Sequence, residues 1–126
     1  PLTYQGYGGF GNQVRDILDI EDLNKLIKEQ ILKINSINNQ TFNVGGGLKN
    51  SISLKELTLL SESITKNFLD IKKNVNTSIY DIRYYVTNNE KVYSRYKWRV
   101  KKKIKNIINE TFSGLKVNKK QLLKIL

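Results

Sequence analysis

The sequence contains neither cysteine nor histidine, and these two absences exclude most covalent and metal-dependent chemistry within the chain. Without cysteine there can be no disulfide, no thiolate-ligated zinc and no thiol nucleophile. Without histidine, no mechanism can use an imidazole as its acid, base or metal ligand. A cysteine-free composition fits a reducing compartment, so we expect a cytoplasmic location.

Alanine and methionine are also absent, and no apolar run approaches the roughly 20 residues that a membrane-spanning helix needs. We therefore expect no membrane partner. What remains is a chain of 126 residues, 39% of them hydrophobic, which can bury a modest core. That length corresponds to one small domain or to a piece of a larger one.

Positive charge is concentrated towards one end of the chain. The formal net charge is +11, yet residues 1–89 carry 10 basic and 9 acidic side chains, whereas residues 90–126 carry 12 and 2. Such asymmetry is typical of a surface that binds nucleic acid or another polyanion. A sequence rich in Lys, Ile and Asn is also what AT-rich codon usage produces, with the lysines on a solvated helical face. We favour the second explanation, so nucleic acid is not the expected partner, and polyanion binding or assembly remains the alternative function.

The first third of the chain has the pattern of two short strands followed by a helix. Residues 2–5 are β-formers, a Gly-rich loop occupies 6–11, and residues 13–18 continue as an extended segment. Asp19 can then cap a helix whose apolar residues recur every three or four positions as far as Ile34.

The rest of the chain alternates between strand-like and helix-like segments. Ser53 and Glu56 have the spacing of a capping box at the start of a second helix, and Trp98 is expected to be a buried anchor. Further strands are predicted at 41–44, 68–72 and 82–86, and further helices at 89–96, at 104–112 with Gly114 as its end, and at 118–126. The segment 41–44 resembles a strand of a parallel sheet, for which this chain offers few neighbours. Part of that sheet is therefore expected to be missing or to come from another chain.

Few residues are candidates for chemistry. Arg15 follows the Gly-rich loop, and its planar guanidinium suits bidentate phosphate binding, although an ordinary surface pair with Asp16 explains it equally well. The triplet Gly45–Gly47 lies between a strand and a helix but lacks the Gly-x-Gly-x-x-Gly spacing, so a simple backbone turn is the favoured interpretation. No Ser/His/Asp set or metal cluster is present in the sequence.

Three motifs together resemble one enzyme family. Residues 6–23 (GYGGFGNQVRDILDIEDL) resemble the G-x-G-x-Q-x-R-D-x-x-H-V-x-D-L segment of extended short-chain dehydrogenases/reductases, the NAD-dependent epimerase/dehydratase family. Residues 42–57 (FNVGGGLKNSISLKEL) are similar to its Y-N-V-G-G-G-x-x-N-S-x-S-L-x-E-L, and residues 81–98 to its D-x-R-Y-Y…W closing segment. The subgroup that it resembles most is the CDP-paratose (CDP-tyvelose) 2-epimerases.

The resemblance implies a fold and a role. It implies an α/β fold, the C-terminal part of an extended Rossmann-type epimerase, with a small mixed sheet and three to four helices. Residues 1–126 would form one nucleotide-sugar-binding region, in which 41–45 is the last strand of the Rossmann sheet and 89–126 is a basic helical tail. The family's NAD-binding glycines and catalytic Tyr-x-x-x-Lys pair would lie upstream of Pro1. NAD would act in the full-length enzyme, none would bind this fragment, and we expect the chain to be inactive alone.

The resemblance also implies a substrate and a partner. The substrate would be a CDP- or UDP-sugar, and the site residues would be Arg15 on the diphosphate, Gln13 near the ribose, Thr3 and Gln5 beside the base, and Ser78 and Asp81 in the R-x-G-D stretch. Ser78 replaces the second diphosphate-binding arginine of the family, a loss of roughly 1.5–3 kcal/mol of charge-assisted contact. Asp19 replaces the family's histidine. An unpaired strand at 41–45 would favour a homodimer or strand exchange.

Overall fold

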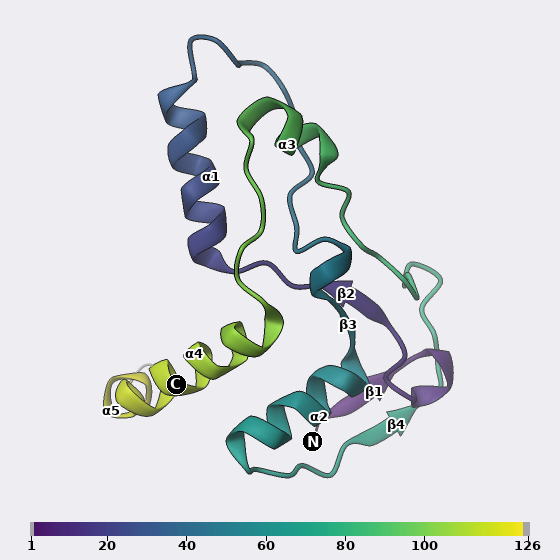
Figure 1. Cartoon of the computed structure of the whole chain (residues 1–126). Coiled ribbons are helices and arrows are strands. Elements are labelled where there is room, and N and C mark those ends of the chain that lie inside the picture. The colour runs from purple at the N-terminus through teal and green to yellow at the C-terminus, as the bar shows by residue number, and fades with distance from the viewer. Residues whose placement is uncertain (1, 125–126) are drawn as a thin grey trace.

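The structure is a computed structural model that describes residues 2–124, and within this range helices accompany two separate strand pairs (Figure 1). The first pair is parallel and joins β1 (Thr3–Gln5) to β4 (Lys72–Asn74). The second is antiparallel and joins β2 (Val14–Asp16) to β3 (Ser51–Ser53). The predicted α/β class is therefore confirmed, although the sheet is divided into two small parts.

The helices begin where local sequence rules place them. Asp19 caps the first by accepting a hydrogen bond from the Glu21 amide at 2.9 Å. Ser53 and Glu56 form the predicted capping box, with amide-to-side-chain distances of 3.2 and 2.9 Å. The helices are α1 (Ile20–Leu32), α2 (Leu54–Thr65), α3 (Glu90–Tyr96), α4 (Ile104–Val117) and α5 (Lys119–Leu122), with 3-10 turns η1 (Tyr7–Gly9) and η2 (Leu48–Asn50).

The core is small and lies between α1, α3 and the segment after α3. It contains Leu26, Val92, Tyr96 and Trp98, so the predicted anchoring role of the tryptophan is confirmed. Phe42 packs its ring edge-on against Tyr96 with centroids 5.4 Å apart. The basic C-terminal segment is therefore tied to the body of the molecule by aromatic packing at its beginning.

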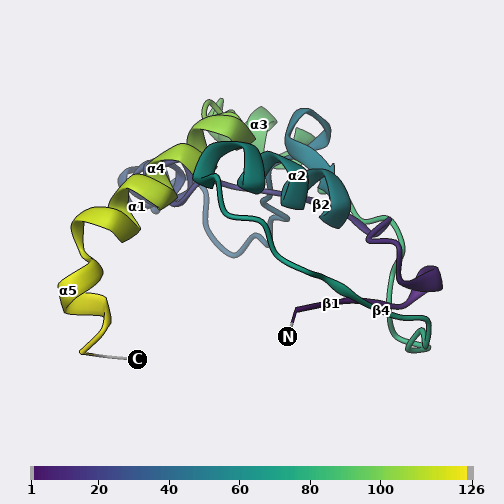
Figure 2. The ribbon, with the colours of Figure 1, turned by 90° about the horizontal axis from the view of Figure 1, so that it is seen from below.

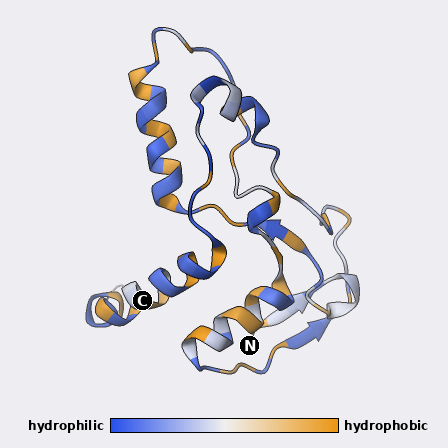
Figure 3. Cartoon of the chain, viewed as in Figure 1, coloured by the Kyte–Doolittle hydropathy of each residue, from blue (hydrophilic) through white to orange (hydrophobic). Residues whose placement is uncertain are grey.

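Much apolar surface stays exposed. Ile20, Ile31 and Ile34 on and just after α1 are each more than half exposed, and the hydrophobic residues of this helix are visible in Figure 3. In both ribbon views α4 and α5 extend away from the strand pairs, with α4 in contact with α2 (Figures 1 and 2). Few side chains are buried for a chain of this size, so apolar surface remains available to pack against further protein.

The strand predicted at 41–44, which the resemblance extends to 41–45, is absent from the described structure. The one hydrogen bond found for residues 41–44 in that part of the chain is from Lys91 Nζ to the Thr41 carbonyl, 2.8 Å. Phe42 and Val44 still pack against the core. A strand exists only through its neighbours, and no other segment within residues 2–124 pairs with this one.

Other predicted boundaries also shift. The strand predicted at 68–72 forms at β4, where β1 is available as a partner, and 82–86 contributes only a single bridge from Tyr84 to Val14. Gly114 does not end α4, because Asn118 donates to its carbonyl at 3.0 Å and the helix runs on to Val117. The last helix is confined to α5, and positions 125 and 126 of the predicted helix lie outside the described residues.

Candidate functional site

Four of the predicted substrate-binding residues meet beside β2. Arg15 donates to the Asp81 carboxylate at 3.2 Å, and Gln13 donates to the other oxygen of that carboxylate at 3.3 Å. Gln13 also donates to the Gln5 backbone carbonyl. Residues that are 66 and 68 positions apart in the sequence thus form one polar cluster, which we call the Arg15 cluster: Gln5, Gln13, Arg15 and Asp81.

The Arg15 cluster is shaped by the turn that precedes it. The Tyr7 hydroxyl donates to the Asp81 carbonyl at 2.6 Å, which joins η1 to the segment that carries the carboxylate. Gly9 has a φ of +69°, and a Cβ there would lie 2.8 Å from the Cβ of Lys73. Only glycine allows this close approach of the turn to β4. The Gly-rich loop therefore positions the cluster through its backbone rather than by binding a ligand itself.

The members of the cluster differ in exposure. Gln13 is 5% exposed, and its Oε1 atom has no hydrogen-bond partner among the described residues. The Arg15 side chain is 41% exposed and that of Asp81 is 24% exposed. A half-exposed guanidinium opposed by one carboxylate keeps donor N–H groups free on its solvent side.

The other two predicted residues lie outside this set of contacts. Thr3 is exposed on β1, two residues from Gln5 and therefore on the same face of the strand. Ser78 is exposed in the turn before Asp81, where its Oγ accepts from the Tyr80 amide at 3.3 Å. Arg83, on the far side of Asp81 in the sequence, has its guanidinium carbon 6.0 Å from the centroid of the Tyr7 ring. A second cation thus lies near the cluster although the arginine of the family motif is replaced.

Asp16 points to the opposite face of β2 and has a structural task. Its carboxylate accepts from the amide of Gly47 at 2.8 Å and from that of Thr87 at 3.2 Å. Burial alone would raise the pKa of Asp16, but these N–H donors outweigh it, so the pKa lies below its usual value of 3.8. The pairing of Arg15 with Asp16, one of the two interpretations of the sequence, is therefore wrong: Arg15 pairs with Asp81.

The glycine triplet is occupied by internal contacts. The Gly45 amide donates to Asn89 at 3.2 Å, the Gly47 amide donates to Asp16, and a Cβ at Gly46 would lie 2.1 Å from the Ile17 carbonyl oxygen. These groups hold the loop against β2. The triplet therefore does not fit a dinucleotide cradle, and it is the backbone turn that its spacing indicates, with positive φ only at Gly47.

Asp22 is the anchor of the basic segment, and sequence patterns do not single it out. Its side chain is 1% exposed and accepts from the amides of Lys101 at 2.7 Å and Lys102 at 2.9 Å. Burial opposes ionisation, but these two donors and Lys25 hold the pKa of Asp22 below its usual 3.8. The Trp98 indole N–H donates to the Asp22 carbonyl at 2.8 Å. As an acid in the first turn of α1, Asp22 also interacts favourably with the helix dipole.

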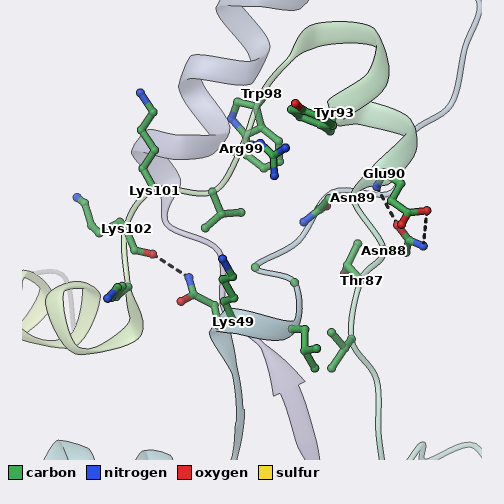
Figure 4. A pocket seen from close by; sticks show the side chains of 17 residues that line it. Lys49, Thr87, Asn88, Asn89, Glu90, Tyr93, Trp98, Arg99, Lys101 and Lys102 are labelled. Carbon is green, nitrogen blue, oxygen red and sulfur yellow. Dashed lines mark hydrogen bonds between the residues drawn. The ribbon is translucent and has the colours of Figure 1, made fainter.

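A broad cavity lies on the Asp16 side of β2. It has a volume of about 810 Å³ and is lined by η2, the residues around Thr87, the α3 helix and the segment 98–103 (Figure 4). Lys49, Tyr93 and Arg99 are among its lining residues, and the Arg99 guanidinium lies 3.7 Å from the centroid of the Tyr93 ring. No sequence motif pointed to this cavity, because its walls come from separate segments.

One Tyr-x-x-x-Lys spacing occurs in the chain, at Tyr93 and Lys97, contrary to the expectation that the pair is missing. The Lys97 ammonium lies 5.4 Å from the centroid of the Tyr93 ring, and the Arg99 guanidinium carbon lies 3.7 Å from it. Arg99, as a donor and as a charge, and the charge of Lys97 hold the pKa of Tyr93 below its usual 10.0. Lys97 itself adopts a left-handed conformation at the end of α3, outside the helix.

The described residues contain neither a cluster of metal ligands nor a membrane-spanning helix. Across residues 2–124, no group of three or more Asp and Glu side chains is arranged to hold a metal ion. None of the helices in the described part of the chain is both long and apolar enough to cross a membrane.

Known proteins resemble this chain in sequence and in fold. No protein-family model matches the chain. The CDP-paratose 2-epimerase of Salmonella typhi is 30% identical over 113 residues, which cover 89% of this chain and 32% of that protein. The dTDP-glucose 4,6-dehydratase of Bacillus anthracis, solved in complex with NAD, has a TM-score of 0.73 at 23% identity and is matched over 89% of this chain and 34% of its own. The Bordetella bronchiseptica enzyme WbmG, solved with NAD and UDP, has a TM-score of 0.63 at 19% identity over 83% of this chain and 32% of its own.

The sequence match and the shared fold confirm the resemblance to the NAD-dependent epimerase/dehydratase family. The chain spans about a third of the length of these relatives.

Proposed function

We propose that this chain is the nucleotide-sugar-binding part of an NAD-dependent epimerase or dehydratase of the CDP-paratose 2-epimerase type, equivalent to the C-terminal third of such an enzyme. The observation that carries the proposal is the Arg15 cluster, in which predicted substrate residues from β1, β2 and the loop at Asp81 come together. The curated relative is a CDP-sugar enzyme by name, and WbmG was solved with UDP.

Arg15 is the proposed diphosphate ligand. Its guanidinium is ordered by Asp81 and by a 2.7 Å hydrogen bond to the Val14 carbonyl, which leaves other N–H groups for phosphate oxygens. Arg83 is the proposed second cation in place of the family arginine that Ser78 replaces. Gln13, whose Oε1 has no hydrogen-bond partner among residues 2–124, would then face the ribose, and Gln5 with Thr3 would face the base.

This chain would supply binding and positioning rather than the reacting groups. In the proposed whole enzyme, the NAD-binding part takes a hydride from a sugar carbon and returns it, and this chain holds the nucleotide end of the substrate in register. We therefore propose that the chain alone has no epimerase activity, in a cytoplasmic enzyme of nucleotide-sugar metabolism.

The segment 41–45 is the proposed junction with the rest of the fold. Gly45 exchanges hydrogen bonds with the Asn89 side chain, but within residues 2–124 the backbone of 41–44 forms only the bond from Lys91 to the Thr41 carbonyl, while Phe42 and Val44 pack against the core. An unpaired extended segment is a template for a strand from elsewhere. We propose that it pairs with the Rossmann sheet of the enzyme or, in isolation, with a second copy of the chain. Asn43→Pro, at an exposed position, removes one amide donor and should abolish self-association in sedimentation, whereas a monomeric wild type would exclude the second copy.

The binding proposal is tested by titrating the chain with CDP and UDP. Arg15→Gln should weaken binding by roughly 10- to 150-fold, because a charge-assisted contact of roughly 1.5–3 kcal/mol is lost. Arg95→Gln removes the same charge from an exposed position on α3 and should leave the affinity unchanged. Equal affinities for Arg15→Gln and wild type, or turnover of a CDP-sugar by this chain alone, would contradict the proposal.

A further inference from the structure

The cavity between η2 and the segment 98–103 is separate from the Arg15 cluster. Arg15 and Asp16 are adjacent on β2, so their side chains point to opposite faces of the strand. Arg15 lies in the cluster, whereas Asp16 ties together Gly47 and Thr87, which line the cavity. The Arg15 cluster and the cavity therefore lie on opposite faces of one strand, and the residues of the cluster do not line the cavity.

The charges of this cavity are not balanced. Lys49, Arg99, Lys101 and Lys103 line it, and none of them forms an ion pair within the described residues. Glu90 is the acidic residue of its lining. Lys102 also lies there, but its ammonium is taken up by Asp19, Glu21 and Glu110 at 3.3, 3.0 and 2.6 Å. Lys49 and Arg99, which lie on this concave surface without a carboxylate partner among residues 2–124, make it attractive for an anion.

Two of these cations are well placed to bind. Figure 4 shows the Lys49 side chain rising from η2 towards the Arg99 guanidinium, which lies against the Tyr93 ring. This stack holds the guanidinium in place before any ligand arrives. The Lys101 and Lys102 side chains point away from this centre in the same view.

We propose that this cavity binds an oligophosphate group, such as the phosphate chain of a nucleoside triphosphate or free polyphosphate, between Lys49 and Arg99. A volume of about 810 Å³ is in the range of small-molecule sites, which is roughly 300–1,000 Å³. The site is independent of the proposed sugar-nucleotide function, because it shares no ligand-contacting residue with the Arg15 cluster.

Nucleic acid is the less suitable ligand for the cavity. Single strands bind by stacking bases on exposed aromatic faces. Here Trp98 is 7% exposed, and Arg99 covers the Tyr93 ring. A chain of phosphate groups, in contrast, needs only the cations Lys49 and Arg99.

The test is a titration of the full chain with tripolyphosphate and with ATP at low salt, followed by the fluorescence of Trp98, the single tryptophan, which lines the cavity. The double variant Lys49→Gln/Arg99→Gln should weaken both ligands by about tenfold or more. The matched control Lys28→Gln/Lys120→Gln removes two exposed charges elsewhere and should change the affinity by less than about twofold. Similar affinities for the two ligands identify the phosphate chain as the recognised group, and tighter ATP binding adds the nucleoside.

A second measurement keeps the result clear if the variant is destabilised. Amide shifts of the wild-type chain on addition of tripolyphosphate should centre on Gly47, Lys49 and Arg99 and leave Arg15 and Asp81 unmoved. The proposal is overturned if the control loses as much affinity as the double variant, if the shifts centre on Arg15, or if single-stranded DNA binds while tripolyphosphate does not. Arg15→Gln should leave the tripolyphosphate-induced shifts at Lys49 and Arg99 unchanged, so failure here and failure of the sugar-nucleotide proposal are distinguishable.

Discussion

The two cationic regions of this chain differ in what faces their charges. Arg15 is opposed by Asp81 at 3.2 Å and belongs to a hydrogen-bonded cluster that is nearly neutral. Lys49 and Arg99, on the other face of β2, have no carboxylate partner in the described residues. A paired cation positions a ligand at little cost to the free protein, whereas an unpaired set gives affinity and repels itself. Net charge alone therefore does not identify the recognition site.

The largest effect is expected from removing Asp22, whose carboxylate holds the backbone of Lys101 and Lys102 at the wall of the cavity. Asp22→Ala would leave the amides of Lys101 and Lys102 without their acceptor in a buried place, which costs about 2–4 kcal/mol. Urea unfolding followed by the Trp98 signal measures the loss. Asp70→Ala, at an exposed position, should change the free energy of unfolding by less than about 0.5 kcal/mol. A small effect of Asp22→Ala would mean that the cavity wall is held by packing alone.

Protonation at low pH should weaken the hydrogen bonds that Asp22 accepts from the basic segment and those that Asp16 accepts from Gly47 and Thr87. The pKa values of Asp16 and Asp22 lie below 3.8 in the folded chain, so both carboxylates stabilise the fold above that pH. This contribution is lost as the pH falls from about 4 through the lowered values. The free energy of unfolding should therefore fall steeply below pH 4, and the double variant Asp16→Asn/Asp22→Asn should show a much shallower slope. Equal slopes would show that other carboxylates govern acid unfolding.

Features that depend on neighbouring residues were predictable from the sequence. The cap at Asp19 and the box between Ser53 and Glu56 involve contacts within three residues, and both formed as expected. The strand at 41–44 was not predictable, because a strand also needs a partner and none is present within residues 2–124. Local pattern indicated the strand, and tertiary context decided against it.

The Arg15 cluster shows the same difference between local contacts, which the sequence predicts, and long-range contacts, which it does not. Arg15 and Asp81 are 66 residues apart, so no spacing rule connects them. Arg15 was a candidate from its place after the Gly-rich loop, whereas Asp81 entered the prediction only through the family resemblance. The task of Asp22 and the cavity around Arg99 had no motif at all, since backbone amides and separate loops build them. Long-range polar contacts of this kind become visible only in three dimensions.

A smaller effect is expected at Arg15, the cation that is paired with Asp81. Asp81→Asn keeps the shape and one oxygen that can accept from Gln13, but it removes the acceptor oxygen and the negative charge that compete with a phosphate for Arg15. We expect tighter CDP binding by at most about fivefold, because an exposed ion pair is worth up to about 1 kcal/mol. Calorimetric titration measures it, and Asp70→Asn is the matched control. Weaker binding would show that the carboxylate orients Arg15 more than it competes.

The smallest effect concerns Lys102, the one cation in the described residues 89–124 that forms ion pairs. Hydrogen bonds from Glu110 and Glu21, with the nearby Asp19, raise the pKa of Lys102, so it stays charged at any physiological pH. Lys102→Gln should lower the melting temperature slightly in low salt and hardly at all near 1 M salt, where such pairs are screened. Lys105→Gln, whose side chain has no ion pair within residues 2–124, should show no salt-dependent loss. If both variants behaved alike, Lys102 would not differ from its unpaired neighbours, and the distinction between paired and unpaired cations on which the oligophosphate site rests would lose its physical basis.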